Sequence, residues 1–376
     1  MTTFTAQDVV YMQMALDLAE KGQFTTTPNP SVGCVLVKDG VIVGRGFHAK
    51  AGEPHAEVMA LREAGENARG ATAYVTLEPC SHFGRTPPCA KGLIEAGVAK
   101  VISAMCDPNP QVAGKGLNLL AEAGIESAVG LLEEKAEWLN RGFLKRMRTG
   151  KPYVQLKMAM SLDGRTAMAS GESKWITGEL ARADVQAERA KASAILSTSA
   201  TVLADDPLLN VRWQQFPDKV KAEYAEENLR QPVRVILDSK HQIQPSQRLF
   251  QIPSSVWLVS DMPRSLVGFP AFCEQIQLAP SNTDLSDLMT ELGRRQINTL
   301  WIEAGATLAG ALIEAKLVDE LIIYIAPKLL GDEARGLCKL PHLQTLAQAS
   351  QWQLHSVERI GDDMKMIYHP RMTEPV

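Results

Sequence analysis

Three side chains that could bind one metal ion restrict how the first hundred residues of this chain can fold. His55, Cys80 and Cys89 supply one imidazole and two thiolates, the ligand set of a catalytic zinc site that leaves a fourth position for water. Glu57 stands two residues after His55. In mid-helix these two side chains would point to opposite sides, so the pair requires a helix that begins beside His55, and Pro54 favours such a start. The sequence therefore predicts a helix start to which two thiols are brought.

This set of donors suits the hydrolytic removal of an amine. Bound zinc lowers the pKa of its water to roughly 7, and a carboxylate beside it can move the proton to the departing amine. His-x-Glu followed by Pro-Cys and a second Cys is the signature of zinc deaminases, which makes Glu57 the candidate catalytic residue. A closed zinc site with His82 as fourth ligand, or buried thiols without metal, are the alternatives, but neither needs a glutamate beside His55. The remaining cysteines are predicted to be packing residues: Cys34, Cys106, Cys273 and Cys338.

Composition narrows the class of protein. With 376 residues the chain exceeds the usual size of one domain, and its formal net charge of −4 provides no basic surface for nucleic acid. No apolar run reaches the ~18–20 residues that cross a bilayer, and the N-terminus lacks a cationic stretch followed by an apolar one. Six cysteines in so long a chain are not typical of a disulfide framework, so the thiols should be reduced. We therefore expect a cytoplasmic protein with neither a nucleic-acid nor a membrane partner.

Short strands and helices alternate in the first half. Thr5 and Asp8 form a capping-box pattern ahead of apolar residues at helical spacing, and Gly22 ends that helix. Asp39-Gly40 is a strong hairpin signal. The pattern favours a layered α/β sheet with helices on both faces. The expected strands are 32–37, 41–43, 72–77, 99–104 and 125–129, and the expected helices after the first are 56–68, 88–96, 116–123 and 131–147.

The polar, cationic stretch 145–152, which ends in Gly150 and Pro152, predicts a solvated linker between two domains, 1–148 and 149–376. Strands and helices alternate again after it, and the polar stretch 212–231 is expected to be an excursion on the surface. The expected strands are 153–158, 194–197, 233–237, 256–259, 299–302 and 321–325, and the expected helices are 178–190, 285–295 and 308–315.

The spacing of the two cysteines departs from that of nucleic-acid and free-nucleoside deaminases, because eight residues intervene instead of two. Four further motifs accompany this long spacing: Pro-Asn-Pro-Ser-Val-Gly at 28–33, Gly-Glu-Pro-His-Ala-Glu at 52–57, Thr-Leu-Glu-Pro-Cys at 76–80 and Asp-Pro-Asn-Pro at 107–110. Together they resemble the pyrimidine deaminase of riboflavin biosynthesis across essentially the first 150 residues. The resemblance implies a cytidine-deaminase-like three-layer α/β/α domain with one zinc ion. It also implies that Asn29, His48 and Arg85 contact a phosphorylated pyrimidine, and a guanidinium such as Arg85 can grip phosphate through two donors.

One motif in this half is a decoy. Residues 44–49 match the Gly-x-Gly-x-x-Gly/Ala fingerprint of dinucleotide-binding proteins by letter. That fingerprint must open a helix, whereas here the turn at Pro54 follows. We therefore do not expect a cofactor at this position.

The second half contains Lys157 and four longer motifs, at 161–166, 171–177, 201–207 and 301–305. They resemble the reductase domain that accompanies this deaminase in bacteria. The resemblance implies a dihydrofolate-reductase-like α/β domain, NADPH as cofactor, reduction of a ribosyl group to ribityl, and a homo-oligomer. The implied NADPH-facing residues are Ala159, Trp175, Thr201, Asp205, Ser239, Gly305, Ala306, Thr307, Leu308, Ala309 and Gly310. The implied substrate-facing residues are Ser173, Arg189, Leu209, Arg212 and Glu303.

The residues themselves support a cofactor site at 299–310, where a strand, a glycine turn and a helix follow one another. Backbone amides and a helix N-terminus at such a turn can approach a pyrophosphate. The turn is not a Walker motif, because Ala311-Leu312 stands where Lys-Ser/Thr is required, and a plain strand–helix connection is the alternative. Asp205 and Glu303 are both candidates for the proton donor of the reduction.

The two resemblances together imply a bifunctional enzyme of riboflavin biosynthesis. Its first half would deaminate 2,5-diamino-6-ribosylamino-4(3H)-pyrimidinone 5′-phosphate with zinc. Its second half would reduce the ribosyl group of 5-amino-6-(5-phosphoribosylamino)uracil with NADPH. Two alternatives stand beside it: a base deaminase that acts on nucleic acid, and a second half that senses a nucleotide without catalysis.

Overall fold

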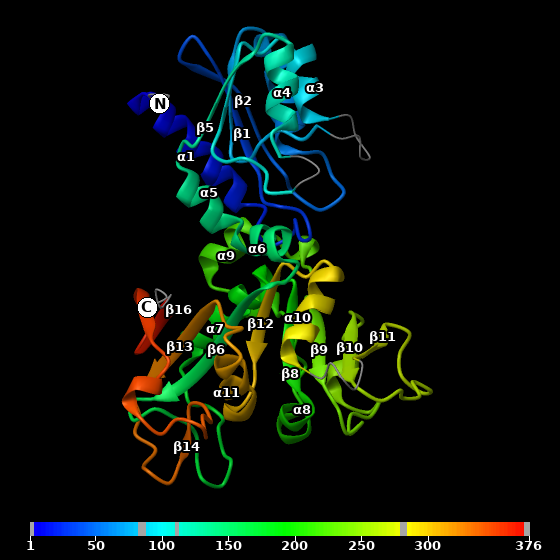
Figure 1. Ribbon diagram of the computed structural model, residues 1–376, viewed down its shortest axis with the longest axis vertical. Helices are drawn as coiled ribbons and strands as arrows, with labels where there is room; N and C mark the ends of the chain where they lie inside the picture. The colour runs from blue at the N-terminus through cyan, green and yellow to red at the C-terminus, as the bar shows by residue number, and fades with distance from the viewer. Residues whose placement is uncertain (1–3, 82–87, 110–112, 279–283, 372–376) are drawn as a thin grey trace. The chain divides into compact units, whose positions relative to one another are not determined.

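The computed structural model describes residues 4–81, 88–109, 113–278 and 284–371. The chain forms two compact units, Met1–Gly150 and Lys151–Val376 (Figure 1). The boundary lies two residues beyond the expected one, and the stretch expected to be a linker is mostly helical. Helix α6 runs through it to Thr149 and stops at Gly150, which adopts the left-handed conformation that commonly ends helices. Within the described residues, no helix is long and apolar enough to span a membrane.

Unit 1 is built on a five-stranded sheet in the order β2-β1-β3-β4-β5. Strand β1 is antiparallel to both of its neighbours, and β3, β4 and β5 are mutually parallel. The predicted hairpin is confirmed: Asp39 and Gly40 both have positive φ, as a tight two-residue turn requires. The strands are β1 (Gly33–Lys38), β2 (Val41–Phe47), β3 (Thr72–Val75), β4 (Lys100–Ser103) and β5 (Glu126–Val129).

Helices cover both faces of this sheet, because β1 alternates between two apolar cores. Val35 and Val37 pack in the core that includes α1, whereas Cys34 and Leu36 pack in the core that includes α2, α3 and α4. The three-layer α/β/α prediction is confirmed. The single helix expected at 131–147 is instead two helices that meet at Asn140. The helices are α1 (Ala6–Glu20), α2 (Ala56–Ala64), the short 3-10 helix Gly65–Ala68, α3 (Cys89–Glu95), α4 (Lys115–Glu122), α5 (Glu133–Leu139) and α6 (Arg141–Thr149).

The dinucleotide-like glycines lie inside strand β2 and contact α2. A Cβ at Gly44 would lie 2.2 Å from the carbonyl oxygen of Ala60, and one at Gly46 would lie 2.2 Å from that of Ala56. These glycines therefore let the helix lie directly on the strand. They have a packing role here, which the sequence interpretation had not assigned to them.

Unit 2 is built on a nine-stranded sheet in the order β11-β10-β9-β8-β12-β6-β13-β16-β15. The strands from β11 to β13 are parallel, and β16 and β15 add an antiparallel hairpin. Two short strands, β7 and β14, pair separately. The strands are β6 (Tyr153–Ser161), β7 (Arg165–Ala167), β8 (Ala194–Thr198), β9 (Val233–Leu237), β10 (Val256–Ser260), β11 (Cys273–Gln277), β12 (Thr299–Glu303), β13 (Glu320–Ala326), β14 (Arg335–Gly336), β15 (Trp352–Ile360) and β16 (Asp363–Pro370).

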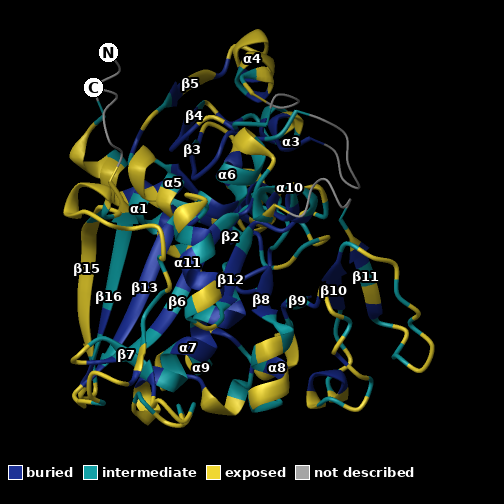
Figure 2. Ribbon diagram, turned by 60° about the horizontal axis from the view of Figure 1, so that its bottom comes forward, coloured by how far each residue is buried: buried dark blue, intermediate teal, exposed yellow. Residues whose placement is uncertain are grey.

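The sheet of unit 2 separates two apolar cores, and Figure 2 shows its central strands buried. Residues of α10 and α11 pack on one face, and residues of α7 pack on the other. The α/β prediction for the second half is confirmed. The helices are α7 (Glu179–Lys191), α8 (Ser199–Asp205), α9 (Asp218–Glu223), α10 (Leu285–Arg294), α11 (Ala306–Glu314) and the 3-10 helices Trp213–Gln215, Glu226–Asn228, Arg248–Gln251 and Leu346–Gln348.

Two expectations about unit 2 need correction. The stretch 212–231 is not a simple surface excursion, because Phe216 and Tyr224 are buried and stack on each other, with ring centroids 5.9 Å apart. Strands β11, β15 and β16 were not expected, because their polar residues hide any apolar pattern. The stretch 212–231 is therefore held by buried aromatic side chains. Strands β11, β15 and β16 are defined by pairing with a neighbouring strand rather than by local hydrophobicity.

In unit 2, the direction in which successive strands are added to the sheet reverses between the neighbouring strands β8 and β12. From β8 the chain moves outward to β9, β10 and β11, and it then returns to place β12 between β8 and β6. In open α/β sheets, ligands bind at such a switch point, beyond the carboxyl ends of the strands. The segments that follow β8, β9 and β12 therefore define a candidate binding edge.

Candidate active sites in the two units

The three predicted metal ligands of unit 1 lie together. His55 is the N-cap residue of α2, Cys89 is the first residue of α3, and Cys80 lies in the segment after β3. His55 Nδ1 is 3.3 Å from Cys89 Sγ and 3.7 Å from Cys80 Sγ, and the three donor atoms all lie within 4.8 Å of one another. One ion bonded at the usual zinc distances can reach all three donors. The sequence-based prediction that a helix begins beside His55 is confirmed.

Glu57 lies in the first turn of α2 and is only 3% exposed. Its Oε2 atom has no hydrogen-bond partner among the described residues. Burial and the negative charge of Cys80 raise the pKa of Glu57 to about 7. A buried carboxylate oxygen without a partner is costly unless a cation or a bound molecule satisfies it. The residues therefore fit a zinc ion with a reacting group beside it.

The two thiols differ in their surroundings. The hydrogen bond from Cys89 lowers the pKa of Cys80 to about 4, and the backbone N–H of Cys89 also donates to Cys80 Sγ over 3.3 Å. The contact with Cys80, together with burial, raises the pKa of the Cys89 thiol. Metal ions bind the thiolate form, so ligation and loss of a proton are coupled at this site.

Two of the three predicted substrate contacts of unit 1 lie beside the ligands. His48 is buried, and its ring meets that of His55 edge-on at 5.4 Å between centroids. His48 Nδ1 is 3.1 Å from the Pro54 carbonyl oxygen, and Nε2 is 3.1 Å from Asn29 Nδ2. The network assigns a proton to Nδ1, so Nε2 accepts from the amide. Arg85 and the alternative fourth ligand His82 lie outside the described residues.

The sequence interpretation missed two residues that hold the Asn29 segment. The side chain of Asn140 accepts from the Ser31 amide over 2.8 Å and donates to the Ser31 carbonyl over 2.9 Å. Arg146 Nη2 donates to the Pro28 carbonyl over 3.3 Å. Both residues lie more than a hundred positions away in the chain, so no local pattern could have indicated them.

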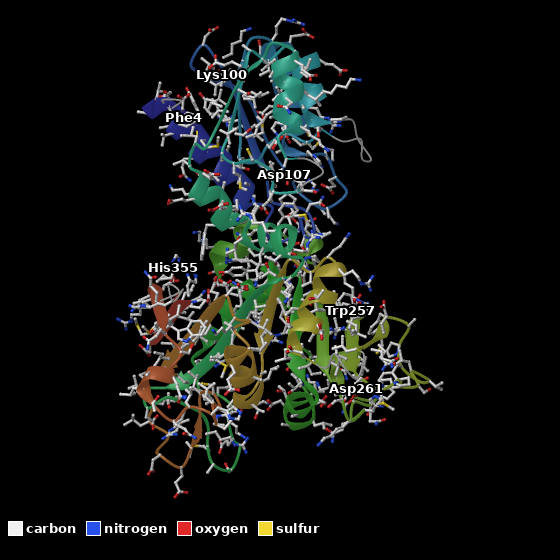
Figure 3. All side chains as sticks on the ribbon, viewed as in Figure 1. Phe4, Lys100, Asp107, Trp257, Asp261 and His355 are labelled. Atoms are coloured by element: carbon white, nitrogen blue, oxygen red, sulfur yellow. The ribbon has the colours of Figure 1, made fainter. Side chains whose placement is uncertain are left out.

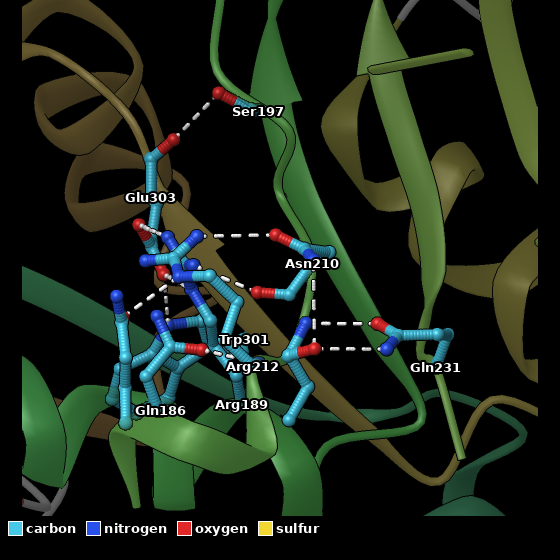
Figure 4. Close-up of polar contacts among 10 residues, drawn as sticks. Gln186, Arg189, Ser197, Asn210, Arg212, Gln231, Trp301 and Glu303 are labelled. Atoms are coloured by element: carbon cyan, nitrogen blue, oxygen red, sulfur yellow. Dashed lines mark hydrogen bonds and ion pairs between the residues drawn. The ribbon is translucent and has the colours of Figure 1, made fainter. Parts of the chain in front are cut away.

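In unit 2, Arg189 and Glu303 form a buried two-pronged ion pair (Figure 4). Arg189 Nε and Nη2 donate to the two carboxylate oxygens over 2.6 and 2.7 Å, and Nη1 donates to the Asn210 carbonyl over 3.0 Å. Trp301 Nε1 also donates to Glu303, over 2.7 Å. Arg189 and Glu303 were both predicted to face substrate. The structure places them together and engages every nitrogen of the guanidinium.

The ion pair controls the charge of Glu303. Burial alone would raise its pKa, but the charge and hydrogen bonds of Arg189 outweigh burial and lower the pKa to about 2. Lys157 contributes in the same direction from the neighbouring strand, where it lies in register with Glu303. Glu303 is therefore ionised at neutral pH. Asp205, the other candidate proton donor, pairs with Lys174 at 3.3 Å.

The remaining predicted substrate contacts differ in how they can act. Arg212 donates hydrogen bonds from Nε to Gln215 Oε1 over 2.7 Å and from Nη1 to Asn210 Oδ1 over 3.1 Å. The Leu209 side chain is buried in the core, so this residue can face a substrate only through its backbone. Ser173 is half-buried in the segment before α7.

The predicted NADPH contacts come from several elements of unit 2. Thr201 and Asp205 lie on α8, and Ser239 follows β9. Ala159 lies near the carboxyl end of β6. Trp175 is 64% exposed, and the Arg182 guanidinium lies 4.7 Å from its ring centroid.

In the predicted glycine turn, 305–310, only the first three residues are accessible to solvent. Gly305 caps α11, and Gly305 and Thr307 are exposed while Ala306 is half-buried. Leu308, Ala309 and Gly310 are buried, and a Cβ at Gly310 would lie 1.9 Å from the Lys339 carbonyl oxygen. The later residues of the turn therefore pack against the core. Within this turn, only the amino end of α11 can therefore approach a cofactor.

Comparison with known proteins matches each unit to a protein family. Residues 5–105 match the cytidine and deoxycytidylate deaminase zinc-binding region, and residues 152–366 match the RibD C-terminal domain. The riboflavin biosynthesis protein RibD of Haemophilus influenzae is 71% identical over 99% of this chain and 100% of its own length. That of Escherichia coli is 58% identical over 95% and 98%, respectively.

Solved structures extend the comparison to three dimensions. Acinetobacter baumannii RibD superposes with a TM-score of 0.90 at 47% identity, covering 97% of this chain and 99% of that one. A Thermotoga maritima diaminohydroxyphosphoribosylaminopyrimidine deaminase/5-amino-6-(5-phosphoribosylamino)uracil reductase superposes with a TM-score of 0.85 at 33% identity, with the same coverage. The chain therefore belongs to the RibD family of riboflavin biosynthesis proteins and is a bifunctional enzyme, a zinc-dependent deaminase and an NADPH-dependent reductase.

Proposed function

We propose that unit 1 deaminates 2,5-diamino-6-ribosylamino-4(3H)-pyrimidinone 5′-phosphate and that unit 2 reduces the ribosyl group of 5-amino-6-(5-phosphoribosylamino)uracil. The observation that carries the first step is the buried, partnerless Oε2 of Glu57 beside the donor set of His55, Cys80 and Cys89. The name of the Thermotoga maritima relative, which joins these two reactions, supports the pairing.

Glu57 is the proton carrier in the proposed deamination. When zinc is bound, it supplies a water that is easily deprotonated. Glu57 takes up that proton and delivers it to the leaving amine. A carboxyl with a pKa of about 7 both accepts and releases protons at neutral pH. Asn29 and His48 orient the pyrimidine, and Arg85 holds its phosphate.

In unit 2, the cofactor would lie along the switch point of the sheet. The amino end of α11, at Gly305 to Thr307, would offer backbone amides to the pyrophosphate. The remaining cofactor contacts in this proposal are Ala159, Trp175, Thr201, Asp205 and Ser239.

The proposed substrate site of unit 2 is built around the buried ion pair. Glu303, held ionised by Arg189, can only accept hydrogen bonds from the substrate. Ser173, Arg212 and the backbone of Leu209 complete the site. A guanidinium such as Arg212 suits the sugar phosphate.

Metal analysis and two activity assays test this assignment. Wild-type protein should hold about one zinc per chain, whereas Cys89→Ser should lose most of the metal and the release of ammonia. NADPH oxidation with the deaminated substrate should persist in that variant. Cys106→Ser is the matched control and should keep the metal, because this thiol is exposed rather than packed in the core as the sequence predicted.

Three results would contradict the assignment. Full metal retention in Cys89→Ser would remove that residue from the ligand set. Loss of metal in His82→Ala would favour a closed structural site. If unit 2 oxidises no NADPH with the deaminated substrate even in wild-type protein, it is a nucleotide-sensing module instead.

We also infer that the protein forms a homo-oligomer through unit 2. Strand β15 is one edge of the nine-stranded sheet and is exposed along most of its length (Figure 2). Figure 3 labels His355 on this strand. Leu354 and Val357 on β15 are each 47% exposed. A long exposed edge strand can pair with a second copy. Light scattering should show an oligomer that Val357→Lys dissociates, and a monomeric wild-type protein would refute the inference.

We propose the cytoplasm as the place of action, because the two thiols of the metal site must stay reduced to bind zinc. The acidic net charge of −4 supports small-molecule substrates rather than nucleic acid as partners. Cell fractionation tests the location, and recovery in an exported fraction would refute it.

A further inference from the structure

A buried carboxylate lies two residues before the ligand Cys80, and the deaminase mechanism above does not use it. Glu78 is only 3% exposed. Its Oε2 accepts from the amides of Gly114 and Asp107 over 3.0 and 3.2 Å. Its Oε1 accepts from the amides of Gly116 and Leu117 over 3.0 and 3.4 Å. A single side chain thus receives four backbone N–H groups.

Three of these donors are the first amides of helix α4. Gly114 is the N-cap of that helix and has no side chain of its own to cap it. Helix starts leave amides unpaired, and a carboxylate both accepts from them and suits the positive end of the helix dipole. Glu78 therefore caps α4 from a position 36 to 39 residues away in the chain. The cap ties the helix to the segment that contains Cys80.

A second observation connects the same two segments. A Cβ at Gly116 would lie 1.9 Å from the carbonyl oxygen of Pro79, so the start of α4 rests directly on the backbone next to Cys80. The Glu78 amide also donates to the Met105 carbonyl over 3.0 Å. The main chain just before the ligand is thus held on several sides.

We propose that Glu78 is a positioning residue for the zinc site, which holds Pro79 and Cys80 against α4 and so sets the place of Cys80 Sγ. Cys80 lies outside any regular element, whereas the other two ligands begin helices. A metal site tolerates only about 0.2 Å of error in ligand distance, so a ligand on an irregular segment needs an anchor. Glu78 acts through the backbone and does not touch the metal.

The proposal rests on the zinc-dependent deaminase function and predicts a defect in metal binding. Outer partners of metal ligands typically contribute about 10- to 100-fold in metal affinity or activity. In Glu78→Gln, the amide group turns its own N–H atoms toward backbone donors, so at least one pair of contacts is lost. Zinc-loaded, full-length Glu78→Gln should release zinc to a chromogenic chelator at least about tenfold faster than wild type.

A purely structural role is separated by a matched control. Thr5 caps α1 in the same unit and pairs with Asp8 of its own first turn. Thr5→Ala removes a helix cap, but its partner is not part of the ligand segment. Both variants should lower the melting temperature. Only Glu78→Gln should speed zinc release and alter the thiolate–metal absorption bands of the cobalt-substituted protein, and NADPH oxidation should be unchanged in both.

The outcomes decide the proposal in either direction. Wild-type zinc release and an unchanged cobalt spectrum in Glu78→Gln would overturn it, whatever the melting temperature. If Glu78→Gln does not fold, Glu78→Asp decides in the same assays, because it keeps the charge but withdraws it from the four amides. Faster zinc release in Glu78→Asp then supports the proposal, and wild-type release refutes it. Failure of the deaminase assignment itself would appear differently, as wild-type protein without zinc or ammonia release.

Discussion

The two units contain the same kind of residue in opposite electrostatic states. Glu57 in unit 1 and Glu303 in unit 2 are both well shielded from solvent, yet the pKa of Glu57 rises to about 7 and that of Glu303 falls to about 2. Burial acts in the same direction on both. The difference is the partner: Glu303 faces Arg189, whereas Glu57 has Cys80 nearby and an oxygen without a hydrogen bond. Partners, rather than burial, decide which carboxyl can carry a proton.

The two sites also differ in how far the chain must fold to assemble them. In unit 1, His55 and Cys89 lie at helix starts, and the donors are of types that seldom occur together without a metal. In unit 2, Arg189 and Glu303 come from a helix and a strand separated by more than a hundred residues. Arginine and glutamate are common on any surface. A site built from rare donors is therefore easier to identify from sequence than one built from common charges.

The largest expected effect tests the proton carrier of unit 1. Glu57→Gln keeps the size of the side chain but cannot accept a proton, so ammonia release should fall by at least ~10²–10⁴-fold. Zinc content should stay near one per chain, because the proposed ligand set does not include Glu57. NADPH oxidation with the deaminated substrate should continue. Surviving ammonia release would exclude Glu57 as the carrier, and loss of zinc would make it a ligand.

The next effect tests the ion pair of unit 2. Arg189→Met leaves Glu303 buried without its partner, which typically costs about 3–5 kcal/mol in the free energy of unfolding. Urea unfolding should show this loss, and reductase activity should fall while deaminase activity remains. Arg294→Met is the matched control, because its side chain is 71% exposed, and should change stability by less than about 0.5 kcal/mol. Equal stability of both variants would mean that the pair contributes nothing to folding.

The pH dependence of stability sharpens the contrast between the two carboxyls. A carboxyl whose pKa is lowered by folding contributes stability above its unfolded pKa and loses it as the pH falls through its folded pKa. For Glu303 this window runs from 4.5 down to about 2, and the shift corresponds to roughly 3 kcal/mol. The stability advantage of wild type over the Arg189→Gln/Glu303→Gln double variant should shrink by about this amount across the window. Urea unfolding at several pH values measures it, and a constant difference would contradict the assigned pKa.

The smallest effect concerns the segment that contains Asn29. In Asn140→Asp, a carboxylate can still accept from the Ser31 amide but faces the Ser31 carbonyl without a proton to donate. Losing one hydrogen bond corresponds to about 1 kcal/mol, so the KM of the deaminase substrate should rise about fivefold. Asn67→Asp, a change at an exposed position, is the control. An unchanged KM in Asn140→Asp would mean that this anchor does not shape the substrate site.

Local patterns in the sequence predicted much of the fold. The capping box at Thr5, the turn at Asp39-Gly40 and the helix start at His55 each depend on residues a few positions apart, and the structure confirms all three. The break at Asn140 was missed, because the helical pattern continues across it. The hairpin of β15 and β16 was missed as well, because its stability comes from pairing with β13 rather than from its own apolar residues.

The sequence by itself determined the chemistry of unit 1, because His55, Cys80, Cys89 and Glu57 are donor types whose spacing has few other uses. It also determined the order of strands and most of the helices in unit 1, which follows from interactions within a few residues. Only the tertiary structure decided what Glu78, Asn140 and Arg189 contact, since each finds its partners far along the chain. The same structure placed Leu308 to Gly310 in the core. Short-range hydrogen bonds and hydrophobic periodicity depend on residues that are neighbours in the sequence. The partner of a buried polar group depends instead on how the whole chain packs.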